Sequence, residues 1–303
     1  MRSFAFVTLA VGALSAYALP SMKRAVDDTT VLNFALTLEH LENAFYSGAL
    51  AKFDEAAFES AGLPSWARGR FVQIGQHEAA HVAFLSAALG SAATQPCEYS
   101  FPYTDPKSFA ALSQALEGVG VSAYAGAAQY ITNKDYLTAA AVVLSTEARH
   151  ASWVAGAVNK IEPWSGPLDI PLGLNEVYTL AAAFITSCPS TNPALPVKAF
   201  PALTLALSSP ASAYPNSQKI TPGSTTSLTY SPTSSSDYAV FFTGLTPIFV
   251  QVSNGKVVVP DTLMGTSYVV ISTSNDATGL EAGVVAGPAI LEIDFDSQGN
   301  VEA

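Results

Sequence analysis

The chain has 303 residues, of which 49% are hydrophobic and only 12% are charged. This composition excludes an intrinsically disordered protein and supplies enough apolar residues for one large domain or two ordinary ones. The formal net charge of -11 argues against nucleic acid as a partner, because an acidic surface repels the phosphate backbone.

The N-terminal segment is typical of a secretory signal. A basic residue precedes an apolar stretch over residues 4–14, and an A-x-A arrangement ends at Ala18. These features predict a signal peptide at residues 1–18, and the dibasic pair ending at Arg24 allows a short propeptide at residues 19–24. A membrane anchor is the alternative, but the apolar stretch is short and no run of about 20 apolar residues follows it. We therefore expect a secreted protein, either extracellular or in the cell wall, with no membrane span.

Residues 25–200 show the periodicity of amphipathic helices, with capping and stop signals between them. The expected long helices cover residues 28–52, 65–89, 106–132 and 134–162, with a shorter fifth helix at 175–186. Asp28 or Thr29 can cap the first of these helices, Asp105 can cap the third, and Pro163 ends the fourth. Four long helices of similar length predict a four-helix bundle.

Residues 201–303 change to Ser/Thr/Pro/Gly-rich turns between short apolar runs. The segment 208–236 resembles a linker that runs into the first strand and offers sites for O-glycosylation. Strands are expected at residues 227–230, 238–243, 248–252, 256–259, 268–272 and 289–295, with a turn at Asn254-Gly255. This pattern predicts a small all-β sandwich. It contains no histidine or cysteine, so the chemistry is sought in the helical half.

Two Glu-x-x-His pairs occur in the second and fourth long helices. They are Glu78 with His81 and Glu147 with His150. Residues three apart share one face of a helix, so each pair can offer a carboxylate oxygen and an imidazole nitrogen to one ion. Both pairs lie on the apolar stripe, where ionised carboxylates cost several kcal/mol unless they are paired or bound to metal.

The first and third helices each carry an inward glutamate, Glu39 and Glu117, followed seven residues later by Tyr46 and Tyr124. Glu42 is the alternative to Glu39, since it lies one turn further along the same helix. The two tyrosines are interpreted as core residues, with electron relay beside a metal pair as the alternative. His40 and His77 are expected at the solvent side or behind the ligands, so that replacing His77 should leave metal content unchanged.

The order Glu, Glu-x-x-His, Glu, Glu-x-x-His resembles the di-iron and di-manganese carboxylate bundles of the ferritin-like superfamily. The segment Leu36-Thr-Leu-Glu-His-Leu-Glu-Asn-Ala-Phe-Tyr46 is similar to the branch of secreted fungal stress-response and sexual-development proteins and plant desiccation-related proteins. The similarity spans residues 27–190. It implies two iron or two manganese ions, held by Glu39, Glu78, His81, Glu117, Glu147 and His150.

The chain has two cysteines, Cys97 and Cys188, and export makes them expected disulfide partners. The fold prediction is thus an all-α ferritin-like four-helix bundle with a fifth short helix, followed by a small all-β sandwich domain.

Two classes of function remain open at this point. A loaded site would act on O2 or peroxide as a ferroxidase, a catalase or a peroxidase. The alternative is a non-enzymatic extracellular or cell-wall stress and development protein, whose bundle keeps the carboxylates as a polar core and whose β domain adheres to polysaccharide or protein. A ferritin-type storage shell is not expected, because the appended sandwich and the tethered fifth helix would obstruct it.

Overall fold

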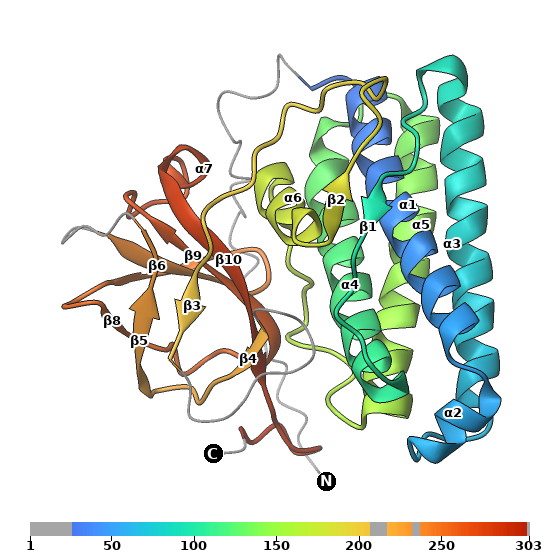
Figure 1. Ribbon diagram of the computed structural model, residues 1–303. Coiled ribbons are helices and arrows are strands. Elements are labelled where there is room, and N and C mark those ends of the chain that lie inside the picture. Colours follow the sequence, from blue (N-terminus) through green and yellow to red (C-terminus); the bar gives the residue numbers. More distant parts are fainter. Residues whose placement is uncertain (1–25, 207–216, 232–236, 302–303) are drawn as a thin grey trace, which may run out of the picture.

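The computed structural model describes residues 26–206, 217–231 and 237–301. Figure 1 shows a bundle of long helices on one side and two small sheets on the other, with α6 between β10 and the bundle. This arrangement confirms the predicted helical half followed by an all-β half. The expected signal peptide at residues 1–18 and propeptide at residues 19–24 lie outside the described residues.

The four long helices are those that the sequence predicts. They are α1 (Asp28–Lys52), α3 (Ala67–Leu89), α4 (Pro106–Ala127) and α5 (Lys134–Trp153), and the shorter helices are α2 (Glu55–Ser60), α6 (Leu174–Ala182) and α7 (Leu280–Gly283). Most contacts between long helices join α1 to α3 and α4 to α5. The bundle is thus built from two helix pairs, and each pair contributes one glutamate helix and one Glu-x-x-His helix.

Helix boundaries follow capping chemistry more closely than the apolar pattern. The cap of α1 is Asp27, whose carboxylate accepts from the Thr30 amide, and not Asp28 or Thr29 as expected. Asp105 caps α4 as predicted, in a capping box with Ser108. These side chains satisfy amide groups that the first helical turn leaves without partners.

Three helices end earlier than their predicted limits. α4 ends at Ala127 and continues as a 3-10 turn (Ala128–Tyr130), while α5 ends at Trp153 and continues as a π-helix (Val154–Asn159). α6 ends at Ala182 because the chain then forms β2 (Ile185–Ser187), which pairs with β1 (Glu98–Tyr99). Local periodicity cannot anticipate a two-stranded ribbon whose strands are far apart in the sequence.

The C-terminal half contains two sheets. The five-stranded sheet has the order β4-β10-β9-β6-β7 and the three-stranded sheet the order β3-β5-β8. The strands are β3 (Thr204–Leu205), β4 (Ser217–Lys219), β5 (Thr225–Thr229), β6 (Tyr238–Phe242), β7 (Ile248–Gln251), β8 (Lys256–Val258), β9 (Gly265–Ser272) and β10 (Val284–Ile293). β4 pairs parallel to β10, and the other pairs are antiparallel. Because β4 and β5 lie inside segment 208–236, the expected linker is in part sheet; residues 207–216 and 232–236 lie outside the described residues.

The strands β6, β9 and β10 of the five-stranded sheet are buried along most of their length. On β9, Tyr268 and Val270 join the core of the bundle, whereas Val269 and Ile271 pack with the three-stranded sheet. Alternate side chains of a strand point to opposite faces, so this division follows directly from the pleat. The molecule therefore has three layers, namely the small sheet, the five-stranded sheet and the helical bundle (Figure 1).

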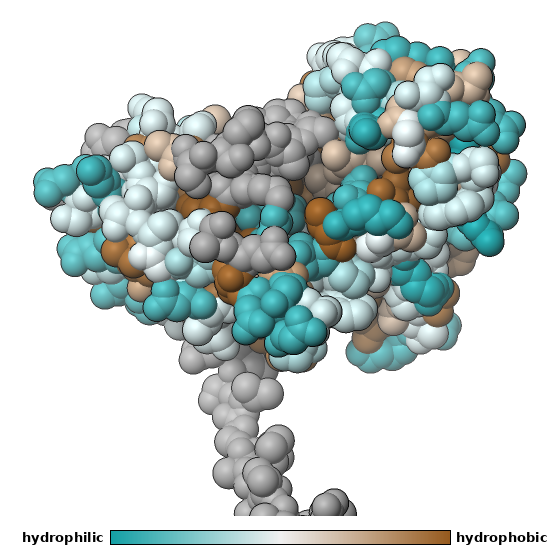
Figure 2. All heavy atoms as spheres, turned by 90° about the horizontal axis from the view of Figure 1, so that it is seen from below, coloured by the Kyte–Doolittle hydropathy of each residue, from teal (hydrophilic) through white to brown (hydrophobic). Residues whose placement is uncertain are grey.

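The surface is mixed in character. In the view from below, apolar groups occur as scattered patches between polar ones (Figure 2). Among the described residues, no helix has the combination of length and apolar character that a membrane crossing needs.

Candidate metal centre

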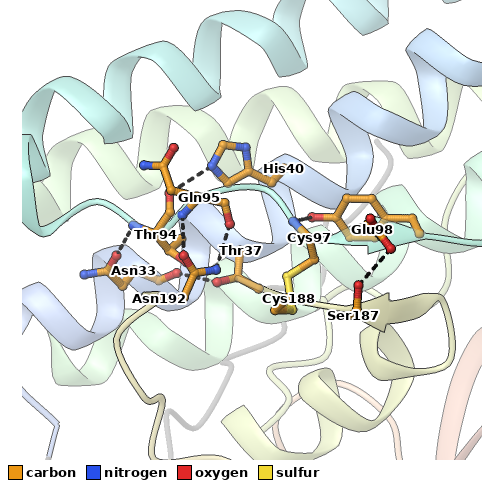
Figure 3. Close-up of a disulfide and its surroundings, with 11 residues drawn as sticks. Asn33, Thr37, His40, Thr94, Gln95, Cys97, Glu98, Ser187, Cys188 and Asn192 are labelled. Carbon is orange, nitrogen blue, oxygen red and sulfur yellow. Dashed lines mark hydrogen bonds between the residues drawn. A yellow bond between two sulfur atoms is a disulfide. The ribbon is translucent and has the colours of Figure 1, made fainter. Parts of the chain in front are cut away.

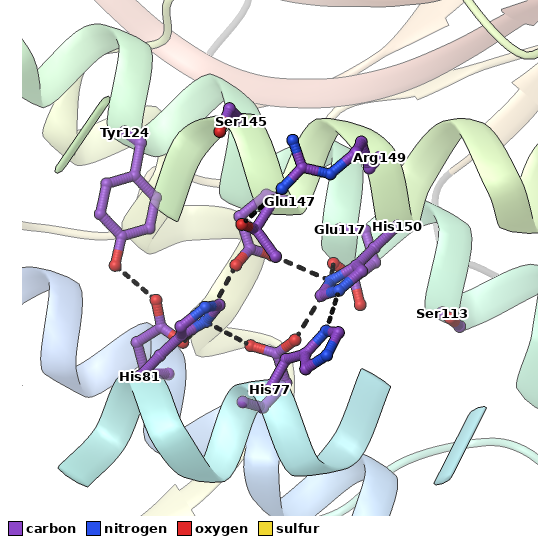
Figure 4. A network of polar contacts seen from close by, with 12 residues as sticks. His77, His81, Ser113, Glu117, Tyr124, Ser145, Glu147, Arg149 and His150 are labelled. Atoms are coloured by element: carbon purple, nitrogen blue, oxygen red, sulfur yellow. Dashed lines mark hydrogen bonds and ion pairs between the residues drawn. The ribbon is translucent and has the colours of Figure 1, made fainter. Parts of the chain in front are cut away.

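The candidate site lies inside the helical bundle, where the four long helices direct acidic and imidazole side chains toward one another (Figure 4). The structure brings together all six residues named from the sequence. α1 contributes Glu39, α3 contributes Glu78 and His81, α4 contributes Glu117, and α5 contributes Glu147 and His150. The four carboxylates are completely buried, with 0% exposure.

The six side chains form two overlapping groups. One consists of Glu39, Glu78, His81 and Glu147, and the other of Glu78, Glu117, Glu147 and His150. Within each group, one potential ligand atom per residue lies within 4.8 Å of all the others. Glu78 and Glu147 belong to both groups, so the two Glu-x-x-His carboxylates stand between two potential cation positions.

Both ligand histidines direct Nδ1 toward the carboxylates. His81 Nδ1 lies 3.2 Å from Glu39 Oε2, 3.0 Å from Glu78 Oε2 and 3.1 Å from Glu147 Oε1. His150 Nδ1 lies 3.2 Å from Glu78 Oε1, 3.1 Å from Glu117 Oε2 and 3.9 Å from Glu147 Oε2. Each imidazole thus faces three carboxylates.

Two tyrosines join the glutamate helices in a reciprocal way. The Tyr46 hydroxyl of α1 donates to Glu117 of α4, and the Tyr124 hydroxyl of α4 donates to Glu39 of α1. Tyr46 also lies 2.7 Å from the Ser113 hydroxyl. The shared Glu-x6-Tyr spacing was the sequence signal for this pairing, because it places each tyrosine two turns beyond its own glutamate and level with the glutamate of the other helix. Both tyrosines are buried in the core, as expected, and their hydroxyls in addition bond carboxylates of the cluster.

Burial is the largest influence on the pKa values of Glu39, Glu117 and Glu147. It raises the pKa of Glu39 to about 8, and together with repulsion among the carboxylates it raises the pKa values of Glu117 and Glu147 well above the ordinary range. The group that repels most strongly in each case is another glutamate of the cluster. Proton or cation binding would relieve this repulsion.

Glu78 and His81 show the opposite balance. Burial disfavours the charged form of Glu78, but the adjacent imidazoles of His150 and His81 outweigh it and lower the pKa of Glu78 to about 2. Burial likewise opposes protonation of His81, but Glu147, Glu39 and Glu78 together raise the pKa of His81 to about 12. Without a metal ion, the protonated His81 ring therefore supplies one positive charge that partly offsets the carboxylates.

Several carboxylate oxygens of the cluster lack the hydrogen bonds that buried oxygens normally make. Among the described residues, Glu78 Oε1 and both oxygens of Glu147 have no hydrogen-bond donor, although Glu78 Oε1 and Glu147 Oε1 lie near imidazole nitrogens. An unsatisfied buried carboxylate costs several kcal/mol. Oxygen and imidazole ligands suit iron and manganese, so this donor set fits two such cations.

The other residues considered from the sequence lie around this cluster. Glu42 is buried on α1 and its pKa is raised by burial, but it belongs to neither group. His40 is buried and not at the solvent side, because its Nε2 donates to the carbonyl of Thr94 at 3.1 Å. Arg149 is exposed and donates to Thr146.

His77 lies at the surface of α3 and also contacts a ligand histidine. Its Nδ1 is 2.9 Å from Nε2 of His150, and the two rings are nearly parallel with centroids 5.1 Å apart. This position, at the solvent side and behind a ligand, agrees with the expectation for His77. No local pattern could show this contact, because it joins residues on α3 and α5 that are 73 positions apart.

Different kinds of side chain border the cluster at its two ends along the bundle. On one side Phe45, Phe71 and Phe109 pack with Tyr46 in edge-to-face and stacked pairs. On the other side Tyr124 borders an apolar cavity of about 30 Å³, which aliphatic residues including Leu85 and Val143 line. The polar cluster is thus enclosed along the bundle axis by apolar side chains.

A disulfide closes the loop that follows α3. Cys97 and Cys188 are bonded, with a sequence separation of 91 residues (Figure 3). The same loop is held by two hydrogen bonds of 2.8 Å between Gln95 and Asn192. These contacts fasten the segment after α6 to the loop that crosses α1.

Comparison with known proteins agrees with this geometry. Residues 27–160 match the family model of the ferritin-like domain. The chain is also similar to the protein rds1 of Schizosaccharomyces pombe, at 28% identity over 181 residues, which cover 59% of this chain and 44% of rds1. The matched region therefore spans less than half of that relative. The segment that matches the ferritin-like domain contains the buried cluster of Glu and His side chains, which could hold metal ions.

Proposed function

We propose that this protein is an exported ferritin-like protein that binds two iron or two manganese ions and serves in oxidative-stress protection or development. The observation that carries the metal assignment is the pair of shared carboxylates. Glu78 and Glu147 lie between the two ligand groups and hold three buried oxygens without a hydrogen-bond donor. Two cations would satisfy these oxygens and offset the repulsion that raises the pKa of Glu147.

Each ion would have its own glutamate and its own histidine. Glu39 and His81 would hold one ion, Glu117 and His150 would hold the other, and Glu78 and Glu147 would bridge them. Glu39 is favoured over Glu42 as the ligand from the first helix, because only Glu39 contacts His81. This division uses all six predicted ligands, shares Glu78 and Glu147 between the ions, and gives both ions a similar environment.

When bound, iron or manganese would supply redox chemistry toward O2 or peroxide. The protein's own contribution is orientation and exclusion of water. The Tyr124 and Tyr46 hydroxyls hold the carboxylates of Glu39 and Glu117 in place by donating to them. The aromatic and aliphatic side chains on either side help to keep the four carboxylates fully buried, which strengthens the electrostatic interactions among them.

The test is the metal content of purified protein after incubation with Fe(II) or Mn(II) and removal of free ions. We expect about two equivalents per chain, by analogy with the two-ion carboxylate bundles. Assays of Fe(II) oxidation, peroxide disproportionation and peroxide-dependent oxidation of an organic donor then distinguish a ferroxidase, a catalase and a peroxidase. Protein that retains no metal would contradict the proposal.

The competing candidate is a metal-free polar core in a non-enzymatic extracellular or cell-wall protein. It is favoured by the contacts of His81 with three carboxylates, which raise the pKa of His81 to about 12 and supply one positive charge without any metal. In that case the C-terminal sheets would serve adhesion to polysaccharide or protein. Absence of bound metal together with unchanged thermal stability in the presence of Mn(II) would favour this candidate.

Export is the second part of the proposal. The Cys97–Cys188 disulfide supports it, because disulfides persist mainly in oxidising compartments. Sequencing the N-terminus of the extracellular protein should find a start after Ala18 or after Arg24. A start at Met1 would contradict a cleaved signal.

A further inference from the structure

The two ligand histidines, His81 and His150, differ in the surroundings of Nε2, the ring nitrogen that does not face the carboxylates. Nε2 of His150 lies 2.9 Å from Nδ1 of His77. Among the described residues, no hydrogen bond is found for Nε2 of His81, although its Nδ1 has the same kind of carboxylate surroundings. The two sites therefore have similar carboxylates, but only His150 has a hydrogen-bond partner at its second ring nitrogen among the described residues.

We propose that His77 is a positioning residue that fixes the orientation and tautomer of His150 for metal binding. This inference rests on the proposed metal site. A metal ligand at Nδ1 must present a lone pair there, so the ring proton of a neutral His150 must be on Nε2. At 2.9 Å, that proton can be donated to Nδ1 of His77. The nearly parallel packing of the two rings, at an interplanar angle of 15°, further restricts rotation of His150.

The position equivalent to His77 provides a natural comparison. His77 precedes Glu78 on α3, and Thr146 precedes Glu147 on α5 in the same way. The Thr146 hydroxyl donates to the Val142 carbonyl at 3.2 Å and accepts from Arg149 at 3.1 Å. Thr146 thus makes contacts within its own helix, whereas His77 reaches across to a ligand of the other helix pair.

The expected consequence is an unequal effect on the two ions. Loss of an outer partner of a metal-bound histidine typically lowers affinity by roughly 10–100-fold. His77→Ala should therefore weaken the ion held by Glu117 and His150 by about that factor, while the ion held by Glu39 and His81 keeps its affinity. This replaces the expectation from sequence that His77→Ala leaves metal content unchanged.

The experiment is a Mn(II) titration of the full chain in four forms: wild type, His77→Ala, His77→Gln and Thr146→Ala. We expect two tight equivalents for wild type and Thr146→Ala, and one tight and one weakened equivalent for His77→Ala. His77→Gln should recover affinity, because its amide oxygen can accept the Nε2 proton of His150. Equal affinities for wild type and His77→Ala would overturn the positioning role, as would a Gln variant as weak as the Ala variant.

A second readout follows His150 directly. The chain has four histidines, so selective 15N labelling of histidine resolves the ring nitrogens by NMR with diamagnetic Zn(II) as the probe. Wild-type protein should show a slowly exchanging Nε2 proton on His150, and His77→Ala should lose it. Persistence of that signal in His77→Ala would also contradict the inference. Wild-type protein that binds no Mn(II) or Zn(II) would instead contradict the proposed metal site, and with it this role of His77.

Discussion

At the scale of single residues, some ligands of the cluster belong to both potential ion positions and others to only one. Glu78 and Glu147 belong to both ligand groups, whereas Glu39 and Glu117 each belong to one. A Gln side chain keeps the volume of Glu but removes the charge. The position of a substitution should therefore decide how many ions are lost.

Glu78→Gln is expected to impair both ions, and Glu39→Gln only one. Metal analysis after dialysis against a dilute buffered metal solution should find less than one equivalent in the first variant and about one in the second. Glu59→Gln, which removes one charge from an exposed position of α2, is the control. Equal loss in the Glu39 and Glu78 variants would contradict the bridging assignment.

Glu176, on α6, is a buried carboxyl group outside the cluster. It is 3% exposed, and burial together with repulsion from Glu281 raises its pKa from an ordinary value near 4.5 to about 7. A raised carboxyl pKa means that the folded protein disfavours ionisation. The free energy of unfolding should therefore fall as pH rises from about 4.5 to 7, by roughly 3 kcal/mol for this group.

Glu176→Gln should remove that dependence. We expect the variant to be more stable than wild type above pH 7 and nearly equal to it below pH 4.5, because wild-type Glu176 is then protonated in both states. Urea unfolding at a series of pH values measures the difference. A stability gain that does not change with pH would show that the effect has another cause.

At the scale of secondary structure elements, much of the site could be predicted because it repeats along helices. Both Glu-x-x-His pairs and both inward glutamates follow helical spacing, and α1 has the bounds that the sequence predicts. The cap of α4 and the turn at Asn254 and Gly255, where both φ angles are positive, could also be predicted, because each depends only on residues that are neighbours in the sequence.

The features that the sequence did not reveal are contacts between distant elements. The contact of His77 with His150 and the pairing of β1 with β2 each join segments far apart in the chain. The π-helix after α5 is local but lacks a distinct pattern, because small apolar residues suit both helix types. Sequence periodicity determines which face is buried, and tertiary packing determines what that face meets.

The aromatic side of the bundle should contribute strongly to stability. Phe109 of α4 is completely buried and packs against Phe45, Phe58 and Phe71. Phe109→Ala should lower the free energy of unfolding by about 3–5 kcal/mol, through lost burial and the cavity that remains.

Phe84 on α3 is the matched control for this substitution. It is 47% exposed, so Phe84→Ala should have a clearly smaller effect on chemical denaturation. Comparable destabilisation by the two substitutions would contradict the assignment of the aromatic residues as a structural core.

At the scale of the whole molecule, the disulfide and the five-stranded sheet tie distant parts of the chain together. The sheet shares one face with the bundle and the other with the small sheet, so β6, β9 and β10 are buried on both sides. The expected sandwich is thus one part of a larger packed body. This explains why β9 is buried at almost every position rather than at alternate positions.

Opening the disulfide should destabilise the native state without dispersing the metal cluster. Closure of a loop of 91 residues restricts the unfolded chain and contributes about 3–5 kcal/mol. The Cys97→Ser/Cys188→Ser double variant should therefore unfold at lower denaturant concentration while binding the same number of ions. A variant that loses both stability and metal would show that the cluster depends on the loop.

Anomalous diffraction from crystals soaked in Mn(II) tests most directly whether the six side chains hold two ions. We expect two anomalous peaks per chain. One should lie among Glu39, Glu78, His81 and Glu147, and the other among Glu78, Glu117, Glu147 and His150. A map with no peak in the bundle, or with a single ion bound outside these two groups, would contradict it.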